Sequence, residues 1–352
     1  MSGKAPHGAN SPRPGMIDFS SNLHPDPPPR HIIDAAAAGI LESTAYPEPS
    51  SESLKTAIAA RLGLRLSPDH ILCGAGSSSL LYQVWSVLSP RTVYLPVPCF
   101  SEFPYAARSL IGARVVEVPA ENVDFSEAPR GSCLVLSNPV NPTGEHFSQD
   151  IVLDWARRMK SAGGWMIVDE AYADFLDDGP AIWSADTLET LPLIVLRSPL
   201  KFFTMPGLRA GYAILPADLA ARVESSVPPW PLSCPAIRAV SAAFAIDPAE
   251  IFSRRRRLRN WADTFLRALR TIPDISVYPS AVHYFLIRLP RSGPDGFEIA
   301  NSLAAAQVWV RTAAGIPGID PWHIRVSTRY PEENGKLVSA LKKIYSKEPS
   351  LS

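Results

Sequence analysis

The chain has 352 residues, more than one hydrophobic core usually organises, so we expect a large domain and a smaller one. Lys and Arg together number 34, as do Asp and Glu, and this balance argues against a protein that mainly binds nucleic acid or an anionic membrane. The four cysteines are dispersed, without a CxxC pair or a His/Cys cluster, which predicts reduced thiols and no metal site.

The N-terminal segment, "MSGKAPHGANSPRPG", has no apolar core of the kind found in signal peptides. No run of about 18 apolar residues follows it, so we expect a soluble, cytoplasmic protein. Prolines are dense up to Pro29, and they disfavour regular structure throughout this region. Residues 1–40 are therefore predicted to form an extended N-terminal arm.

Residues 41–240 are predicted to form the large domain, because short apolar runs alternate there with segments of helical pattern. The apolar runs cover residues 71–73, 93–97, 133–137, 165–171, 193–198 and 212–215. This alternation is typical of βαβ units and predicts an α/β fold, with a mainly parallel sheet covered by helices on both faces. Ligands bind such sheets at the carboxyl ends of the strands.

The alternation of apolar runs and helical segments ends at about residue 240, and residues 241–352 are predicted to form a smaller α+β domain. Asp247 as N-cap, Pro248 at the first helical position and Glu250 in a capping box predict a long helix over 247–272. Strands over 282–289 and 323–328 and a helix over 331–345 follow. The arginines of the run 254–259 fall mostly opposite the apolar residues of the long helix, which favours a solvated face over a nucleic-acid site.

Polar residues stand where three predicted strands end. Asp169 closes one strand, Asn141 follows a second, and Lys201 follows a third. Since the carboxyl ends of parallel strands share one edge of a sheet, a carboxylate, an amide and an amine are expected to meet there.

A glycine turn supplies the second part of this predicted site. In "CGAGSSS" (73–79), Gly76 lets the backbone approach a ligand closely, and the free N–H groups around Ser77 and Ser78 at the helix start favour phosphate. The hydroxyl of Ser198 and the guanidinium of Arg209 are suitable further phosphate donors. A phosphate cradle beside a buried lysine and an aspartate fits pyridoxal 5'-phosphate (PLP), which needs a Schiff-base lysine and an anionic partner for its pyridinium nitrogen.

Each of these residues then has a candidate role. Asp169 is expected to hold the ring nitrogen protonated, Tyr172 and Asn141 to hydrogen-bond the ring hydroxyl, and Phe100 to stack on the ring face. Lys201 as an ordinary surface lysine is a weaker interpretation, because Asp169, Asn141 and Arg209 occupy matching places.

The same residues carry a family resemblance. The motifs are "NPTG" (141–144), "DEAY" (169–172), "SPLK" ending at Lys201, and "GLRAGY" containing Arg209. Together they resemble fold-type I PLP enzymes of the class I/II aminotransferase group. This resemblance implies a seven-stranded-type sheet, Lys201 as the Schiff-base residue and proton shuttle, and a homodimer with sites at the subunit interface. It also implies that Tyr46 reaches the cofactor phosphate of the other subunit.

Within that group the chain is most similar to L-threonine-O-3-phosphate decarboxylases of the cobalamin pathway, and next to histidinol-phosphate aminotransferases. The similarity is carried by "PHGAN" with His7 and Asn10, by "IDFSSN" ending at Asn22, by "PPWPLS", and by "IRVSTR" with Arg325 and Arg329. A substrate with a carboxylate and a phosphate needs cationic groups beyond those of the cofactor site. Arg325 and Arg329, four residues apart on a predicted strand, are expected on one face, and His7, Asn10 and Asn22 are candidates for the phosphate.

Four features depart from these relatives, one of which is the serine run 77–79, where more acidic or polar residues are usual near the phosphate turn. Ala45 precedes Tyr46 where an arginine is usual, Ser233 stands where an asparagine is expected, and His283 replaces another asparagine. The sequence thus favours PLP-dependent decarboxylation of a phosphorylated amino acid, with O-phospho-L-threonine as the expected substrate, over transamination of histidinol phosphate or another anionic amino compound. A catalytically idle PLP-binding subunit is a third interpretation, which the complete set of Lys201, Asp169, Asn141 and Arg209 disfavours.

Overall fold

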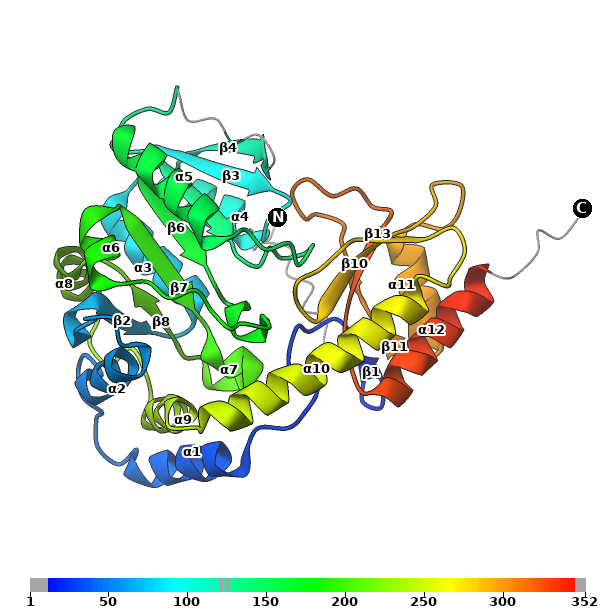
Figure 1. Ribbon diagram of the computed structural model, residues 1–352, viewed down its shortest axis with the longest axis horizontal. Helices are drawn as coiled ribbons and strands as arrows, with labels where there is room; N and C mark the ends of the chain where they lie inside the picture. Colours follow the sequence, from blue (N-terminus) through cyan, green and yellow to red (C-terminus); the bar gives the residue numbers. More distant parts are fainter. Residues whose placement is uncertain (1–11, 121–122, 124–126, 346–352) are drawn as a thin grey trace, which may run out of the picture.

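The computed structural model describes residues 12–120, 123 and 127–345, and two sheets organise them side by side (Figure 1). The larger sheet has seven strands in the order β2-β8-β7-β6-β5-β3-β4. They are β2 (Ile71–Gly74), β3 (Thr92–Val97), β4 (Arg114–Pro119), β5 (Cys133–Ser137), β6 (Trp165–Asp169), β7 (Leu193–Arg197) and β8 (Gly211–Ile214). Only β8 runs antiparallel to its neighbours within this sheet, so the predicted α/β class with a mainly parallel sheet is confirmed.

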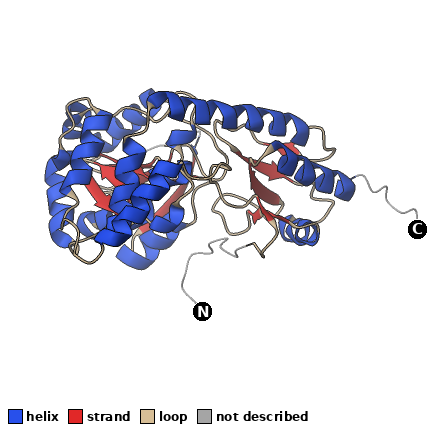
Figure 2. Cartoon of the chain, turned by 90° about the horizontal axis from the view of Figure 1, so that it is seen from below, coloured by secondary structure: helices blue, strands red, loops and turns tan. Residues whose placement is uncertain are grey.

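Alternation along the strands creates two hydrophobic layers, one on each face of this sheet. In β5, Leu134 packs into one layer and Val135 into the other, and β7 repeats this with Val195 and Ile194. One face is covered by α3 (Ser77–Leu88), α4 (Glu102–Ile111) and α8 (Ala217–Ser226). The other is covered by α2 (Glu52–Leu62), α5 (Gln149–Ser161), α6 (Ala185–Thr190) and α9 (Cys234–Phe244). Figure 2 shows helices around both groups of strands.

The smaller sheet is antiparallel, in the order β12-β13-β10-β9. Its strands are β9 (Ser276–Val277), β10 (Tyr284–Arg288), β12 (Arg311–Thr312) and β13 (His323–Ser327), and it packs against α11 (Gly296–Ala305) and α12 (Pro331–Tyr345). The helix α10 (Pro248–Leu269) runs from the larger part to this one (Figure 1). Strand β1 (Ile17–Asp18) pairs in parallel with β11 (Val308–Trp309), which joins the N-terminal segment to the smaller part.

The predicted extended arm is wrong from Arg30 onwards. Residues Arg30–Glu42 form α1, with Pro29 as its N-cap residue, because the chain after the last proline of this region can adopt helical dihedrals. Helix α1 packs against α9 so closely that a Cβ on Gly39 would lie 2.7 Å from the backbone of Pro235. This segment is therefore an integral layer of the larger part.

The long helix α10 begins with Asp247 and Pro248 as the sequence predicts, since the Asp247 carboxylate accepts a hydrogen bond from the Ala249 amide at 2.8 Å. The predicted capping box is wrong, because the Glu250 side chain makes no hydrogen bond to the Asp247 amide among the described residues. The expected solvated arginine face is wrong for Arg254, which is buried. Its guanidinium donates to the backbone oxygens of Asp26 and Pro27 and so fastens the N-terminal segment to α10. The four cysteines are free thiols, and no helix in the described part of the chain is both long and apolar enough to cross a membrane.

Candidate functional site

The ends of β5, β6 and β7 meet at a small cavity of about 50 Å³ beside Lys201. Strand β7 leads directly into the single turn α7 (Pro199–Phe202), which presents Lys201. The cavity is lined by Ser77, Ser78, Phe100, Ser137, Asn141, Asp169, Ala171, Tyr172 and Lys201. The sequence predicted all of these except Ser137 and Ala171, both of which lie at strand ends where the same rule could have found them.

Asp169 is held in place by its own strand end. Its carboxylate accepts a hydrogen bond from the Ala171 amide at 3.1 Å. Burial raises the pKa of Asp169, while Lys201, the Ala171 amide and the Ser77 hydroxyl act in the opposite direction. A cationic group placed next to this carboxylate would favour its charged form.

Lys201 lies over an aromatic surface. Its Nζ atom is 4.2 Å from the centre of the Tyr172 ring, and Tyr172 in turn packs edge-on against Tyr284. The Tyr284 hydroxyl donates to the Val140 carbonyl at 3.0 Å, which connects the smaller sheet to the loop after β5. Nothing in the local sequence marks Tyr284 as part of this region, because its place depends on contacts between the two parts of the protein.

The turn between β2 and α3 forms an anion cradle. Gly76 has a φ of +91°, a conformation that favours glycine, and a Cβ there would lie 2.8 Å from the Arg209 guanidinium, which would have to shift. Arg209 donates to the Ala75 carbonyl at 3.1 Å, and the hydroxyls of Ser77 and Ser78 lie at the first turn of α3. Free N–H groups, hydroxyls and a guanidinium thus gather at one helix start, an arrangement suited to a phosphate.

Arg325 approaches the same cavity from the smaller sheet. It is buried in β13, and it donates to Asn141 Oδ1 at 2.5 Å and to the Ser20 carbonyl at 2.6 Å. Burial lowers the pKa of Arg325. Its Nε has no hydrogen-bond partner among the described residues, so one donor of this guanidinium remains available beside Asn141.

The N-terminal segment crosses the site between β13 and α7. Ser327 Oγ donates to the Ser21 carbonyl at 2.7 Å, and the His24 amide lies 3.4 Å from the Lys201 carbonyl. Asn22 lies between these anchors, is 4% exposed, and has no hydrogen-bond partner for either amide atom within the described chain. A buried unpaired amide at this position is suited to a polar ligand.

The predicted pairing of Arg325 and Arg329 on one strand face is wrong. Strand β13 ends at Ser327, and the chain turns there, so Arg329 lies outside the strand. Its Nε is 3.3 Å from a carboxylate oxygen of Glu333. His283 lies in this region and is almost fully buried, with its ring stacked 4.0 Å from that of Phe175. Burial, followed by the charges of His24, Arg325 and Arg329, lowers the pKa of His283 well below 6.5.

Four further predicted residues, Tyr46, His7, Asn10 and Ser198, are not among the described residues that line this cavity. Tyr46 is 80% exposed and stacks on Trp230, with ring centres 4.6 Å apart. His7 and Asn10 lie outside the described residues. Ser198 is buried immediately before α7, as its motif predicts, although it does not line the cavity itself.

Comparisons with known proteins agree with this architecture. The family model "Aminotransferase class I and II" matches residues 14–341. The chain is 27% identical to histidinol-phosphate aminotransferase 2 of Archaeoglobus fulgidus, over 94% of this chain and 93% of that protein. It is 30% identical to threonine-phosphate decarboxylase of Salmonella typhimurium, over 94% of this chain and 91% of that protein. The crystal structure of L-threonine-O-3-phosphate decarboxylase from Porphyromonas gingivalis superposes with a TM-score of 0.84 at 23% identity, covering 94% of this chain and all of that one.

Proposed function

The chain belongs to the class I and II aminotransferase family and is a PLP-dependent enzyme, and from this premise we propose that it decarboxylates a phosphorylated amino acid. The proposed substrate is O-phospho-L-threonine, and the proposed product is aminopropanol phosphate. Similar identities to a threonine-phosphate decarboxylase and to a histidinol-phosphate aminotransferase support a substrate that carries both an amine and a phosphate.

The residues around Lys201 fit PLP. Gly76, Ser77, Ser78 and Arg209 would hold the phosphate, with Ser198 nearby, since a side chain at position 76 would fill the cradle. Asp169 would face the ring nitrogen, Tyr172 and Asn141 the ring hydroxyl, and Phe100 one ring face. When bound at Lys201, PLP withdraws electrons from the α-carbon of the substrate.

Arg325 is the observation that carries the proposal. It is a buried cation that enters the cavity region next to Asn141, with a free Nε, and no carboxylate of the described chain forms an ion pair with it. A buried unpaired guanidinium is costly and is suited to a bidentate anion such as the substrate carboxylate. We further propose that Asn22, His283 and Arg329 contact the substrate phosphate, together with His7 and Asn10; Asn22 and His283 are buried with unpaired polar atoms.

Arg325, Lys201 and two tyrosine rings would each have a separate role in the reaction. Arg325 would hold the substrate carboxylate and thereby fix the orientation of the bonds around the α-carbon. Lys201 Nζ would be the group that delivers a proton to the α-carbon after CO2 leaves. The aromatic rings of Tyr172 and Tyr284 would keep water away from this proton.

A homodimer is part of the proposal. Tyr46 and Trp230 form an exposed aromatic pair, and Ile40 and Leu41 expose further apolar surface on the same α1–α9 side of the molecule. We propose that this surface meets a second copy and that Tyr46 reaches the cofactor phosphate held by that copy.

Incubation of the PLP-loaded enzyme with O-phospho-L-threonine, without any keto-acid acceptor, tests the function. The expected result is stoichiometric release of CO2 and aminopropanol phosphate. L-Threonine is the matched control for the phosphate, and histidinol phosphate is the control that has no carboxylate to lose. Turnover that requires 2-oxoglutarate, or that prefers histidinol phosphate, would instead establish an aminotransferase.

A further inference from the structure

A second cavity lies behind α7, on the side of the larger sheet that carries α2 and α9, and it is separate from the cavity at Lys201. Its volume is about 320 Å³, within the range of small-molecule sites. The end of α2, the loop 174–183, strands β7 and β8, α9 and the start of α10 form its walls. No residue that lines the Lys201 cavity lines this one.

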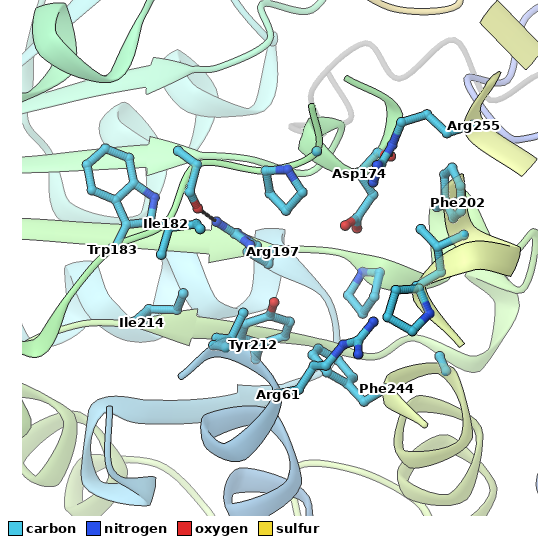
Figure 3. Close-up of a pocket in the computed structure, with 18 of the residues that line it drawn as sticks. Arg61, Asp174, Ile182, Trp183, Arg197, Phe202, Tyr212, Ile214, Phe244 and Arg255 are labelled. Atoms are coloured by element: carbon cyan, nitrogen blue, oxygen red, sulfur yellow. Dashed lines mark hydrogen bonds between the residues drawn. The ribbon is translucent and has the colours of Figure 1, made fainter. Parts of the chain in front are cut away.

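Two opposite charges face this cavity. Figure 3 shows the Asp174 carboxylate and the Arg61 guanidinium directed into it from different walls. Among the described residues neither group forms a side-chain hydrogen bond or an ion pair within 4.0 Å. Asp174 is half-buried, and burial raises its pKa, whereas Arg61 is exposed at the rim.

The other two cations of the cavity are already engaged. Arg197 donates to the Glu170 carboxylate at 2.7 Å and to the Ala181 carbonyl at 2.6 Å. Arg255 donates its Nε to the backbone oxygen of Asp174 at 2.9 Å. These hydrogen bonds fix the wall. The charges of Arg197 and Arg255 oppose the effect of burial on the pKa of Asp174, but neither guanidinium bonds directly to its carboxylate, which stays available to a ligand together with Arg61.

The rest of the lining is mostly apolar and aromatic. Phe202, Phe203, Phe244 and Ile251 form one side, and the Trp183 indole is held by a 2.9 Å hydrogen bond to Glu170. Because Asp174 and Arg61 enter from different walls, a ligand with a single charge would pair with one of them and leave the other without a partner. A compact zwitterion with an apolar side chain satisfies both charges and the aromatic surface.

We propose that this cavity binds an apolar α-amino acid, with its ammonium group on Asp174, its carboxylate on Arg61, and its side chain against Phe202 and Phe244. The occupied cavity touches the active site from behind, because Pro199 and Phe202 stand on either side of Lys201 in α7. Binding therefore stabilises the turn that presents Lys201. The proposal does not depend on which reaction the enzyme performs.

Calorimetric titration of the PLP-loaded enzyme after borohydride reduction tests this site, because reduction fixes the cofactor on Lys201 and prevents an amino acid from reacting there. The probe is L-phenylalanine, compared with phenethylamine and 3-phenylpropionate, which each carry one of its two charges. L-Phenylalanine is expected to bind about tenfold or more tighter than either analogue, since each analogue loses a charge-assisted hydrogen bond.

Two variants locate the binding site. Arg61→Gln should weaken L-phenylalanine about tenfold, whereas Arg65→Gln, the same change on a neighbouring exposed arginine outside the cavity, should leave it unchanged. Asp174→Asn should weaken the binding of L-phenylalanine by a similar factor. If Asp174→Asn does not fold, the result for Arg61→Gln is sufficient to test the proposal. Absence of binding, equal binding of the singly charged analogues, or equal affinity in Arg61→Gln and wild type would overturn the proposal.

Discussion

The two halves of the candidate site are held in different ways. The half formed by Asp169, Lys201 and the Gly76 turn lies at the ends of β6, β7 and β2 of one sheet, and the Asp169 carboxylate already accepts a hydrogen bond from the Ala171 amide. The half formed by Arg325, Asn22 and His283 combines the smaller sheet with the crossing N-terminal segment. In this second half the Asn22 amide and Arg325 Nε are buried without partners in the described chain. The cofactor half, whose carboxylate is already hydrogen-bonded, thus faces a ligand-facing half whose buried polar groups lack partners.

The largest loss of activity is expected in the cofactor half, which contains Asp169, Lys201 and the Gly76 turn. Lys201→Ala should lower turnover by about 10²–10⁴-fold or more, because the residue that binds the cofactor and moves the proton is lost. Mass spectrometry after borohydride reduction should also show no covalent pyridoxyl group. Lys160→Ala, an exposed lysine on α5, is the matched control and should retain both. Covalent attachment that persists in Lys201→Ala would place the cofactor elsewhere.

The second-largest loss of activity is expected in the ligand-facing half, which contains Arg325, Asn22 and His283. Arg325→Gln should lower kcat/KM by about 10–150-fold, which corresponds to the loss of one buried charge-assisted contact of about 1.5–3 kcal/mol. Arg329→Gln should cost less, because Arg329 already pairs with Glu333. Steady-state kinetics on one substrate measure both. A larger loss in Arg329→Gln would assign the substrate carboxylate to that arginine instead.

The difference between the halves also explains what the sequence could predict. Asp169, Asn141 and Lys201 follow apolar strands directly, so a local rule about strand ends was enough to bring them together. Arg325 bonds to Ser20, 305 residues away, and no local pattern reports such a contact. For the same reason the sequence placed Arg329 on a strand that ends at Ser327, and missed Tyr284.

The ligand-facing half should also make the protein sensitive to acid. Burial, followed by the charge of Arg254, lowers the pKa of His24 from 6.5 to about 2, and burial likewise lowers the pKa of His283. The unfolded chain therefore takes up protons first, and the free energy of unfolding should fall as pH drops below about 6.5. The slope should be up to about 1.4 kcal/mol per pH unit for each histidine.

Chemical denaturation at pH 7 and pH 5 measures this slope. His283→Asn, which restores the asparagine usual in related enzymes, removes one titrating group and should make the decline less steep by up to about 1.4 kcal/mol per pH unit. Exposed His31 provides the control, because His31→Asn should leave the slope unchanged. An identical slope in His283→Asn and wild type would show that His283 is not buried as a neutral ring.

The smallest effects are expected for substitutions of Ser233, and they test whether this residue contacts the substrate or only caps α9. Ser233 is the N-cap residue of α9, where its Oγ accepts a hydrogen bond from the Ala236 amide at 3.4 Å. Ser233→Ala should lower the free energy of unfolding by about 1 kcal/mol, the usual cost of a lost N-cap. It should leave kcat/KM unchanged, since the hydroxyl acts on the helix rather than on the cavity. Ser233→Asn should preserve both quantities, because asparagine caps a helix equally well. A change in substrate preference in Ser233→Asn would instead show that this position reaches the substrate, and would extend the ligand-facing half to the start of α9.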